Sequence, residues 1–384
     1  MSRSPQRVLT VVQVLPALEM GGVERGTLEV ARRLVREGHR SIVISAGGRM
    51  VEQLQAEGSE HLNWDVGAKR LATLRWIPRI RRLLRETRPD VLHLRSRLPA
   101  WMAYGAWKSL PSAERPSLVT SLHGFYRPGW YSSIMVRGEH IIAISAAVRD
   151  HMVKHYPWLD ASRIRVIHRG VDPVAYPYGY TPPESWLASW QAQHPELREK
   201  YILTFPARLS RRKGHEDFIA VIAGLKELGV PVHGLIVGGT HPRKRHYEAE
   251  LRTLIREKDL SGSITLLGHR SDLREIMAVS AVVLSLSREP EAFGRVSLEA
   301  LSIGRPVIGY DHGGVGEQLA AIFPEGLVQL EDVQHIIERI KTWQRTPPLV
   351  PVHQPFTLER MLTATLEVYE EAAAMRAARR AESA

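Results

Sequence analysis

The stretch that most constrains the fold runs from Ala281 to Tyr310, and its pattern is strand, turn, helix and strand. An apolar run rich in β-branched residues opens it at Ala281–Leu286. A helical pattern follows at about Arg295–Ile303, and Gly304 stands where a helix commonly ends. Pro306–Ile308 then begins another short buried strand. This order predicts a βαβ unit whose ligand-facing loop lies at the carboxyl end of its first strand.

Two glutamates eight positions apart fall in this unit, Glu291 in the loop and Glu299 in the helix. Carboxylates in these positions can accept hydrogen bonds from the paired hydroxyls of a sugar or a ribose. Gly294 lets the backbone approach a ligand closely, and free N–H groups at the helix start favour an anion. The pattern therefore favours recognition of a polyol phosphate. The spacing alone is also compatible with a turn residue and a residue on an exposed helix face.

The length of 384 residues exceeds one ordinary core and predicts two α/β domains. We expect the first domain over residues 1–175 and the second over residues 201–352. Residues 176–200 and those just before them are rich in proline and show no clear period, which is typical of a linker. The last segment, residues 353–384, carries a helical pattern from about Thr357 to Arg380.

The first domain opens with a predicted strand over residues 7–15, a turn that contains Gly21 and Gly22, a helix at Thr27–Glu37 and a strand at Ser41–Ser45. This order is a second βαβ unit. The glycines do not form the GxGxxG pattern, and no acidic residue stands where a dinucleotide ribose would need it. NAD binding is therefore disfavoured. The alternative to a ligand-binding role for Gly21 and Gly22 is a tight strand-to-helix turn, which accounts for one glycine but less easily for two.

A histidine and a pair of cations follow other predicted strands. His123 comes directly after Ser117–Leu122, and open α/β sheets bind their ligands at the carboxyl ends of the strands. Arg208 and Lys213 come after Tyr201–Phe205 and could neutralise a leaving group that gains negative charge. The alternatives are a structural histidine and an ordinary basic loop, because the chain has 17 histidines and a net charge of +11.

In their order along the chain, these motifs resemble the retaining glycosyltransferases of family 4. Glu291-Ala-Phe-Gly through Glu299 is similar to the E-x7-E signature of that family, and Arg208 with Lys213 is similar to its R-x4-K pair. The resemblance implies the GT-B fold, in which two Rossmann-like, doubly wound parallel-sheet domains face each other across a cleft. It implies an acceptor side in residues 1–175, a nucleotide-sugar site in residues 201–352, and a helix in residues 353–384 that crosses back to the first domain.

The resemblance also implies roles for individual residues. It places His123 and Glu291 at the reacting centre. Arg169 stands where the family usually has asparagine, so no contact is carried over to it. The donor diphosphate would be bound by Gly21, Gly22, Arg208, Lys213, Gly294 and Arg295, and the donor ribose and base by Glu299, Gly268 and His269.

No metal and no other cofactor is expected, only a nucleoside diphosphate sugar as co-substrate. The chain has no cysteine for a thiolate-bound metal and no Asp-x-Asp motif for a metal-bound diphosphate. The lack of cysteine also fits a cytoplasmic protein. The apolar run Val8–Leu18 is too short to span a bilayer, and it is interpreted as a strand rather than a signal peptide.

Much of the positive charge is concentrated between Lys69 and Arg97, with Trp76 inside this region and Trp101 and Trp107 after it. A basic helix with interfacial tryptophans would suit an anionic membrane surface. The alternative is a solvated helix face whose leucines pack into the core. Nucleic acid is compatible with the charge but is not expected as a partner.

Three segments, Arg95–Trp101, His123–Tyr126 and His168–Asp172, are similar to bacterial lipopolysaccharide-core sugar transferases of family 4. This similarity implies transfer to an anionic glycan or glycolipid, by a cytoplasmic protein that could attach to the inner face of the cytoplasmic membrane. One alternative is a GT-B nucleotide-sugar epimerase, which would need acid and base carboxylates that the first half does not offer. The other is a non-catalytic protein that binds sugar or nucleic acid, which would leave the ordered motifs unexplained.

Overall fold

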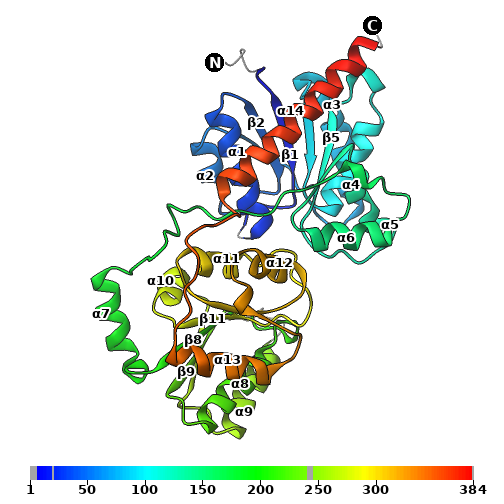
Figure 1. The fold of residues 1–384 in the computed structure, drawn as a ribbon. Coiled ribbons are helices and arrows are strands. Elements are labelled where there is room, and N and C mark those ends of the chain that lie inside the picture. Colours follow the sequence, from blue (N-terminus) through cyan, green and yellow to red (C-terminus); the bar gives the residue numbers. More distant parts are fainter. Residues whose placement is uncertain (1–6, 20, 240–244, 383–384) are drawn as a thin grey trace. The chain divides into compact units, whose positions relative to one another are not determined.

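The computed structural model describes residues 7–19, 21–239 and 245–382. The chain divides into two compact units. The first consists of Met1–Arg169 together with Glu359–Ala384, and the second is Gly170–Leu358. The boundary thus falls at residue 169, a few residues before the expected one at 175. Each unit is an α/β structure built on its own parallel sheet (Figure 1), as the βαβ patterns predict.

The first unit contains a seven-stranded sheet with the order β3-β2-β1-β4-β5-β6-β7, and every strand pair in it is parallel. The chain moves outward from β1 to β3 on one side and from β4 to β7 on the other. Right-handed crossovers therefore put helices on both faces of the sheet. The strands are β1 (Thr10–Val14), β2 (Arg40–Ser45), β3 (Glu60–Asn63), β4 (Val91–Leu94), β5 (Ser117–Leu122), β6 (His140–Ala143) and β7 (Ile164–Val166).

The helices of the first unit connect these strands, except for α14, which comes from the far end of the chain. They are α1 (Gly22–Arg36), α2 (Val51–Ala56), α3 (Trp76–Thr87), α4 (Arg97–Lys108), α5 (Trp130–Ser133), α6 (Ala146–His155) and α14 (Leu358–Glu382), and short 3₁₀ helices include η1 (Leu71–Arg75) and η3 (Ile134–Val136).

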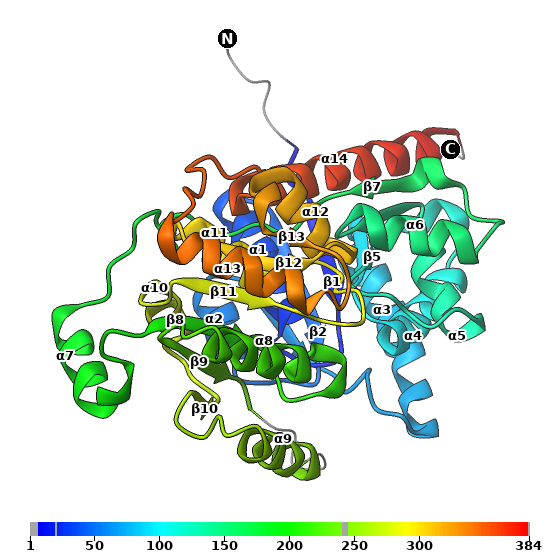
Figure 2. The same cartoon turned by 60° about the horizontal axis from the view of Figure 1, so that its bottom comes forward.

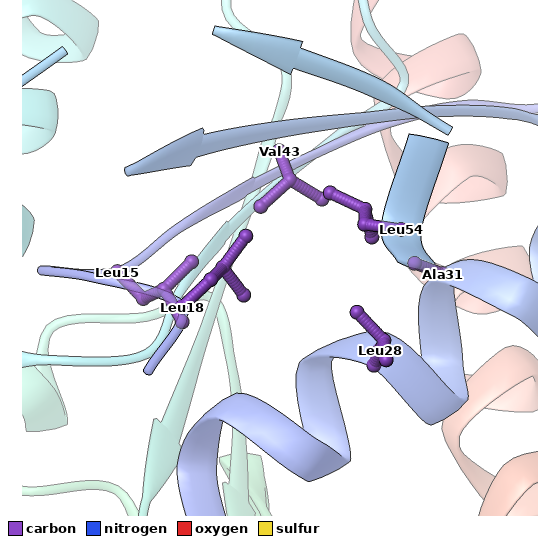
Figure 3. Packing of buried hydrophobic residues seen from close by; sticks show 6 residues of the cluster. All are labelled: Leu15, Leu18, Leu28, Ala31, Val43 and Leu54. Carbon is purple, nitrogen blue, oxygen red and sulfur yellow. The ribbon is translucent and has the colours of Figure 1, made fainter. Parts of the chain in front are cut away.

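Apolar side chains of α1, α2, β2 and the segment that follows β1 form a core cluster on one face of this sheet (Figure 3). The strands β1 and β2 are almost continuously buried rather than alternately exposed, because helices cover both faces of a doubly wound sheet. Each large apolar side chain that becomes fully buried contributes about 1.5–3 kcal/mol. The cluster consists of Leu15, Leu18, Leu28, Ala31, Val43 and Leu54.

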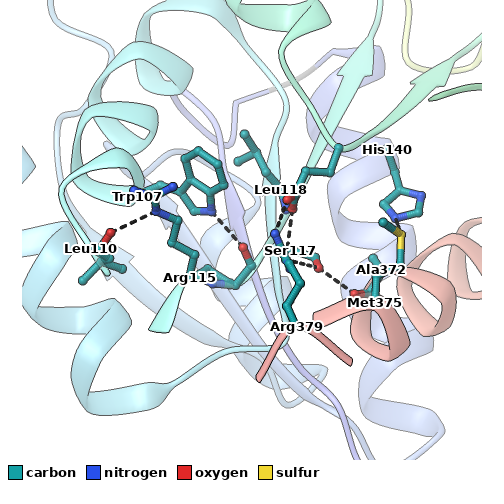
Figure 4. A network of polar contacts seen from close by, with 11 residues as sticks. Trp107, Leu110, Arg115, Ser117, Leu118, His140, Ala372, Met375 and Arg379 are labelled. Carbon is teal, nitrogen blue, oxygen red and sulfur yellow. Dashed lines mark hydrogen bonds and ion pairs between the residues drawn. The ribbon is translucent and has the colours of Figure 1, made fainter. Parts of the chain in front are cut away.

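The helix α14 completes the first unit by polar as well as apolar contacts. The hydroxyl of Ser117 donates a hydrogen bond to the backbone oxygen of Ala372 over 2.6 Å, and Arg379 reaches the same hydroxyl (Figure 4). Arg376, which is 3% exposed, forms an ion pair with Asp90 over 3.1 Å. These contacts fix the helix against the amino-terminal ends of β4 and β5.

The second unit contains a six-stranded parallel sheet with the order β10-β9-β8-β11-β12-β13 (Figure 2). Its strands are β8 (Tyr201–Pro206), β9 (Val232–Val237), β10 (Ile264–Gly268), β11 (Val282–Ser285), β12 (Val307–Tyr310) and β13 (Leu327–Val328). Its helices are α7 (Glu184–Gln193), α8 (His215–Glu227), α9 (Arg245–Glu257), α10 (Leu273–Ala278), α11 (Arg295–Ser302), α12 (Gly313–Ile322) and α13 (Val333–Arg345).

The interpretation of residues 176–200 as a linker is wrong. This segment belongs to the second unit and contains α7. Trp190 and Leu197 are buried in one cluster with Leu235 and Ile276, and Trp186 stacks on Trp190 with 5.0 Å between the ring centroids. The prolines suggested an irregular connection. Pro183 instead caps the start of α7, where a missing N–H costs nothing, and the tryptophans four positions apart give the helix its apolar face.

The helix expected at Thr27–Glu37 begins five residues earlier, at Gly22, so the predicted glycine turn is largely helical. The contact with Arg169 gives a reason for the glycine at position 26, inside this helix. A Cβ there would lie 2.3 Å from Nη1 of Arg169, so a larger residue would displace that guanidinium. Within the described ranges, none of the helices is both long and apolar enough to cross a membrane.

Candidate active site

The loops that follow β8 and β11 in the second unit are tied together through their backbones. The N–H of Arg288 donates to the backbone oxygen of Arg212 over 2.9 Å. In the first of these loops, Gly214 adopts a left-handed conformation with φ +78°. A Cβ there would lie 2.0 Å from the backbone oxygen of Leu286, in the second loop. Glycine is therefore required at the point where the two loops approach each other most closely. This approach brings Lys213 next to Glu291, 78 positions later in the sequence.

The carboxylate of Glu291 is held by two donors. The Nζ of Lys213 lies 2.8 Å from Oε1 of Glu291, and the hydroxyl of Ser287 donates to the same oxygen over 2.6 Å. Burial by itself would raise the pKa of Glu291. The positive charge of Lys213 and the two hydrogen bonds outweigh that effect and hold the pKa below its usual value. Glu291 is consequently a fixed anion that accepts hydrogen bonds, rather than a proton donor, near neutral pH.

The helix α11 begins at Arg295, as the sequence predicts, with Gly294 as its N-cap, and it ends at Ser302, one residue before the expected Ile303. Gly294 has φ +83°, and a Cβ there would lie 2.4 Å from Cγ2 of Val315. Its glycine character is thus needed for the turn and for packing against α12. The first N–H groups of α11 lack partners within the helix, which makes this end attractive to an anion.

Two cavities lie around these groups, one of about 550 Å³ and one of about 200 Å³. Arg208, Lys213 and Glu291 line both of them. Ser287 and Gly239 also line the larger cavity, and Gly294 and Arg295 line the smaller one. The structure therefore brings together five of the predicted residues, all from the second unit.

The residues predicted to bind the ribose and base do not line these two cavities. Glu299 is 7% exposed, and its carboxylate forms an ion pair with Arg295 over 3.6 Å. Gly268 and His269 are exposed at the carboxyl end of β10. The oxygen of Gly268 accepts a hydrogen bond from the N–H of Gly238 over 2.8 Å, so this edge adjoins Gly239 of the larger cavity.

His123, Gly21 and Gly22 belong to the first unit, at the carboxyl ends of β5 and β1. Gly21 precedes α1 with an extended backbone, and Gly22 is its first residue, where a Cβ would meet no atom within 4 Å. The role of the glycine pair in binding the donor diphosphate stays a prediction. A Cβ at Gly21 would touch the carboxylate of Glu24, 2.4 Å away.

The imidazole of His123 is fixed by Arg169, which the sequence left without a role. NH2 of Arg169 lies 2.8 Å from Nδ1 of His123. Because a guanidinium can only donate, Nδ1 must accept, and the ring hydrogen of the neutral imidazole is assigned to Nε2. Nε2 is buried, and no described residue lies within hydrogen-bond distance of it. Burial, then the charges of Arg169 and Arg95, hold the pKa of His123 well below 6.5.

These pKa directions give Glu291 and His123 distinct chemical roles, since one is an anion and the other a neutral ring. His123 stays neutral and offers one N–H, so it can donate a hydrogen bond but is a poor base. Arg208, Lys213 and the start of α11 can together stabilise a diphosphate, which gains charge when the bond to it breaks. The residues that the sequence analysis missed are Ser287 and Arg169. Ser287 stands four positions before Glu291 and could have been found as a loop donor, whereas nothing in the sequence indicates the contact of Arg169.

In this parallel-sheet unit, a cation pair and a fixed carboxylate line two cavities and a helix start lines the smaller one, which suits the binding of a nucleotide sugar. Comparison with known proteins gives the family. Residues 20–174 match the model of Glycosyltransferase Family 4, and residues 188–350 match that of Glycosyl transferases group 1. The chain belongs to the family 4 glycosyltransferases and has the GT-B fold.

Solved structures and curated relatives agree with this family. A glycosyltransferase from Rickettsia africae superimposes with a TM-score of 0.81 at 29% identity, with 96% of this chain and 99% of that chain covered. WaaG, a glycosyltransferase involved in lipopolysaccharide biosynthesis, shares the fold with a TM-score of 0.65 at 16% identity, with 95% and 99% covered. The glycogen synthase of Mycobacterium tuberculosis is 25% identical over 353 residues, which cover 81% of this chain and 79% of the relative.

The chain spans only about half the length of another curated relative. It is 26% identical to the alpha-maltose-1-phosphate synthase of Mycolicibacterium smegmatis over 213 residues, 54% of this chain and 53% of the relative. The two curated relatives are thus named for different products. They indicate a glycosyltransferase that uses nucleotide sugars, and they leave the acceptor to be inferred from the chain itself.

Proposed function

We propose that this enzyme transfers a sugar from a nucleoside diphosphate sugar to a cell-surface glycan or glycolipid with retention of configuration and without a metal ion. The observation that carries the proposal is the pairing of Lys213 with Glu291 over 2.8 Å, in a wall shared by two cavities that Arg208 also lines. A cation beside a fixed carboxylate suits the place where a sugar meets its diphosphate.

In the proposed reaction, each group of the site has a separate role. Arg208, Lys213 and the N–H groups at the start of α11 neutralise the departing diphosphate. Glu291 accepts hydrogen bonds from hydroxyls of the donor sugar, and no acidic proton is needed there because its pKa is low. The departing phosphate oxygen takes the proton of the acceptor hydroxyl on the same face, as the family resemblance implies. Glu299 is proposed for the ribose, which requires that its carboxylate share or exchange the contact with Arg295.

His123 is proposed as a hydrogen-bond donor to the reacting sugar. Its Nε2–H group is the one polar atom of the ring without a partner in the described chain. A neutral donor stabilises oxygen-centred negative charge and does not repel the positive charge that develops on an oxocarbenium-like sugar. The tautomer that Arg169 enforces fits this role and does not fit a general base.

For the acceptor we propose an anionic glycolipid of the lipopolysaccharide-core type. The net charge of +11 and the similarity of fold to WaaG support it. The tryptophans expected to contact the membrane do not suit that task, because Trp76 and Trp107 are 6% and 8% exposed. The exposed apolar residues nearest to the basic helix α3 are Leu71 and Leu74, at 87% and 52% exposure. We propose that η1 and α3 attach the enzyme peripherally to an anionic membrane.

Calorimetry with UDP, ADP, GDP, dTDP and NAD tests the donor site. We expect one diphosphate to bind in the micromolar range, NAD not to bind, and Lys213→Ala and Glu299→Ala to weaken binding. Lys226→Ala serves as the matched control, because Lys226 lies on α8 of the same unit in an exposed pair with Asp259. A folded protein that binds none of the nucleotides would contradict the proposal. Conversion of a donor sugar without any acceptor would favour the epimerase.

A further inference from the structure

One surface of the first unit consists of aromatic rings alternating with guanidinium groups. Trp130 stacks on Trp101 with 4.4 Å between centroids and 19° between planes. The guanidinium of Arg137 lies 6.0 Å from the ring of Trp101 and 5.7 Å from that of Trp158. Arg97 lies 5.1 Å from the ring of Tyr131. We call these six residues the aromatic–arginine strip: Arg97, Trp101, Trp130, Tyr131, Arg137 and Trp158.

Three rings of the strip are unusually exposed for their size. Trp130 is 71%, Trp158 57% and Tyr131 39% accessible to solvent. Large aromatic side chains are normally well covered, and neighbouring exposed ones mark surfaces that bind something. None of the three contributes to the buried core, so packing does not account for their presence.

The exposed rings are held on a rigid support. The indole N–H of Trp101 donates to the backbone oxygen of Tyr131 over 3.0 Å. Just before Trp130, the hydroxyl of Tyr156 donates to the oxygen of Gly129 over 3.0 Å and accepts from its N–H over 3.1 Å. Arg97 donates to the hydroxyl of Ser132 over 3.2 Å. A pre-positioned surface loses little conformational entropy on binding.

The positive charges of the strip are not neutralised. Throughout the part of the chain that the structure describes, neither Arg97 nor Arg137 has a carboxylate within 4 Å. Other exposed arginines of this unit do, such as Arg85 with Glu114 and Arg165 with Glu371. Guanidiniums that stack on rings keep their N–H edges free for an anion such as a phosphate or carboxylate.

The strip is continuous with His123. The backbone N–H of His123 donates to the hydroxyl of Tyr126 over 3.3 Å, and the guanidinium of Arg97 lies 4.8 Å from the ring of Tyr126. Arg97 also lies over the ring of Tyr131, and Trp101, which donates to the oxygen of Tyr131, stacks on Trp130. A ligand chain whose end reaches His123 would therefore lie along the strip.

We propose that the aromatic–arginine strip binds the distal part of an anionic glycan acceptor. Sugar rings stack on Trp130 and Trp158, and phosphate or carboxylate groups of the glycan bind Arg97 and Arg137. This assignment rests on the proposed function, which it extends from the reacting end of the acceptor to its remaining sugars. A glycan fits better than a lipid bilayer because charged groups alternate with the rings, whereas the exposed leucines that suit a bilayer lie on η1.

Binding of deacylated, phosphorylated lipopolysaccharide-core oligosaccharide tests the proposal, with the dephosphorylated oligosaccharide as a second probe. We expect Trp130→Ala to weaken binding of both probes about threefold to tenfold. Arg137→Ala should weaken only the phosphorylated one by a similar factor. Both side chains are on the surface, so the fold should be unaffected. Arg36→Ala is the matched control for charge, because Arg36 is exposed on α1 of the same unit.

Nucleotide binding, measured on the same variants, separates this proposal from the proposed function. Nucleotide binding should be unchanged in both strip variants, because the donor site lies in the second unit. Wild-type protein that binds nucleotide but neither oligosaccharide would overturn the strip and leave the donor site standing. The strip would also be overturned if Trp130→Ala abolished flotation with anionic vesicles while oligosaccharide binding stayed unchanged, since the occupant would then be a membrane.

Discussion

Arg169 donates a hydrogen bond to Nδ1 of His123 over 2.8 Å, although the two residues are 46 positions apart in the sequence. The missing side chain of Gly26 leaves the space that the guanidinium occupies. Three neighbouring groups oppose protonation of His123, in the order Arg169, Arg95 and His93. Arg169 is thus a positioning residue: it selects the tautomer and, after burial, contributes most to the low pKa of His123.

Replacing Arg169 should make the state of His123 sensitive to pH. In Arg169→Met the pKa of His123 is expected to rise, while burial, the largest cause of its low pKa, and the charge of Arg95 remain. Transfer activity should then decline on the acid side at a higher pH than in the wild type. NMR of ¹⁵N-labelled histidine measures tautomer and protonation without any substrate. Arg165→Met is the control, since Arg165 is an exposed arginine of the same unit. A His123 signal with the same tautomer and the same pKa as in the wild type would refute this role.

The pair of Lys213 and Glu291 should be energetically coupled. Lys213→Ala leaves a largely buried carboxylate without its cation, so the pKa of Glu291 should rise and diphosphate binding should fall about tenfold or more. A double-mutant cycle with Glu291→Gln should give a coupling free energy of about 1–3 kcal/mol for stability. The same cycle on the exposed pair Lys226 and Asp259 should give a value close to zero. Equal coupling in the two pairs would show that Lys213 is only a surface cation.

The left-handed turn at Gly294 should not tolerate a side chain. Gly294→Ala combines φ +83° with a Cβ 2.4 Å from Cγ2 of Val315, and it should lower the free energy of unfolding by about 1–3 kcal/mol. Because Gly294 begins α11, nucleotide affinity should fall as well. Gly262→Ala is the matched control, since a Cβ at Gly262 meets no atom within 4 Å. Urea unfolding of both variants measures this loss. Equal unfolding midpoints for Gly294→Ala and Gly262→Ala would show that the turn at Gly294 tolerates a side chain.

The second unit should lose stability in acid through His215. Burial lowers the pKa of His215 to about 4, although the charge of Glu216 opposes the shift. Below pH 6.5 the unfolded chain binds a proton at His215, whereas the folded chain binds it only near pH 4. The contribution of His215 to the free energy of unfolding is therefore complete above pH 6.5, and about 3 kcal/mol is lost between pH 6.5 and 4. In His215→Leu the free energy of unfolding should change less over this range, whereas the exposed control His246→Leu should behave like the wild type. Parallel pH curves for wild type and His215→Leu would contradict the assignment.

The sequence predicts those features of the fold that depend on neighbouring residues. The unit from β11 to β12 follows from an apolar run, from Gly304 as a helix end and from Pro306, all of which act locally. The helix α7 was missed because the prolines before it were given more weight than the spacing of Trp186 and Trp190. Local patterns identify the start of a helix less well than its existence, as the start of α1 shows.

The candidate site shows the same limit. Lys213, Glu291 and Gly294 could be identified one by one, because each has a recognisable position after a strand or before a helix. The contact between Lys213 and Glu291 joins two loops that only the strand order β8-β11 makes neighbours. Arg169 could not be identified at all, since its partner is chosen by the tertiary structure. The tryptophans were judged from composition, which does not reveal that Trp76 stacks on Trp64 in the interior.

The position of α14 has a consequence for how the protein is made. Tyr369 is fully buried against β4, where its hydroxyl lies 2.6 Å from Nδ1 of His93, and Arg376 pairs with Asp90. These partners are separated by the whole second unit, so the ribosome must synthesise residues 170–358 before α14 emerges. The second unit can fold as soon as it is synthesised. Synthesis of the first unit begins earlier, but one face of its sheet stays uncovered until α14 has been made. The first unit is therefore the last to complete its fold.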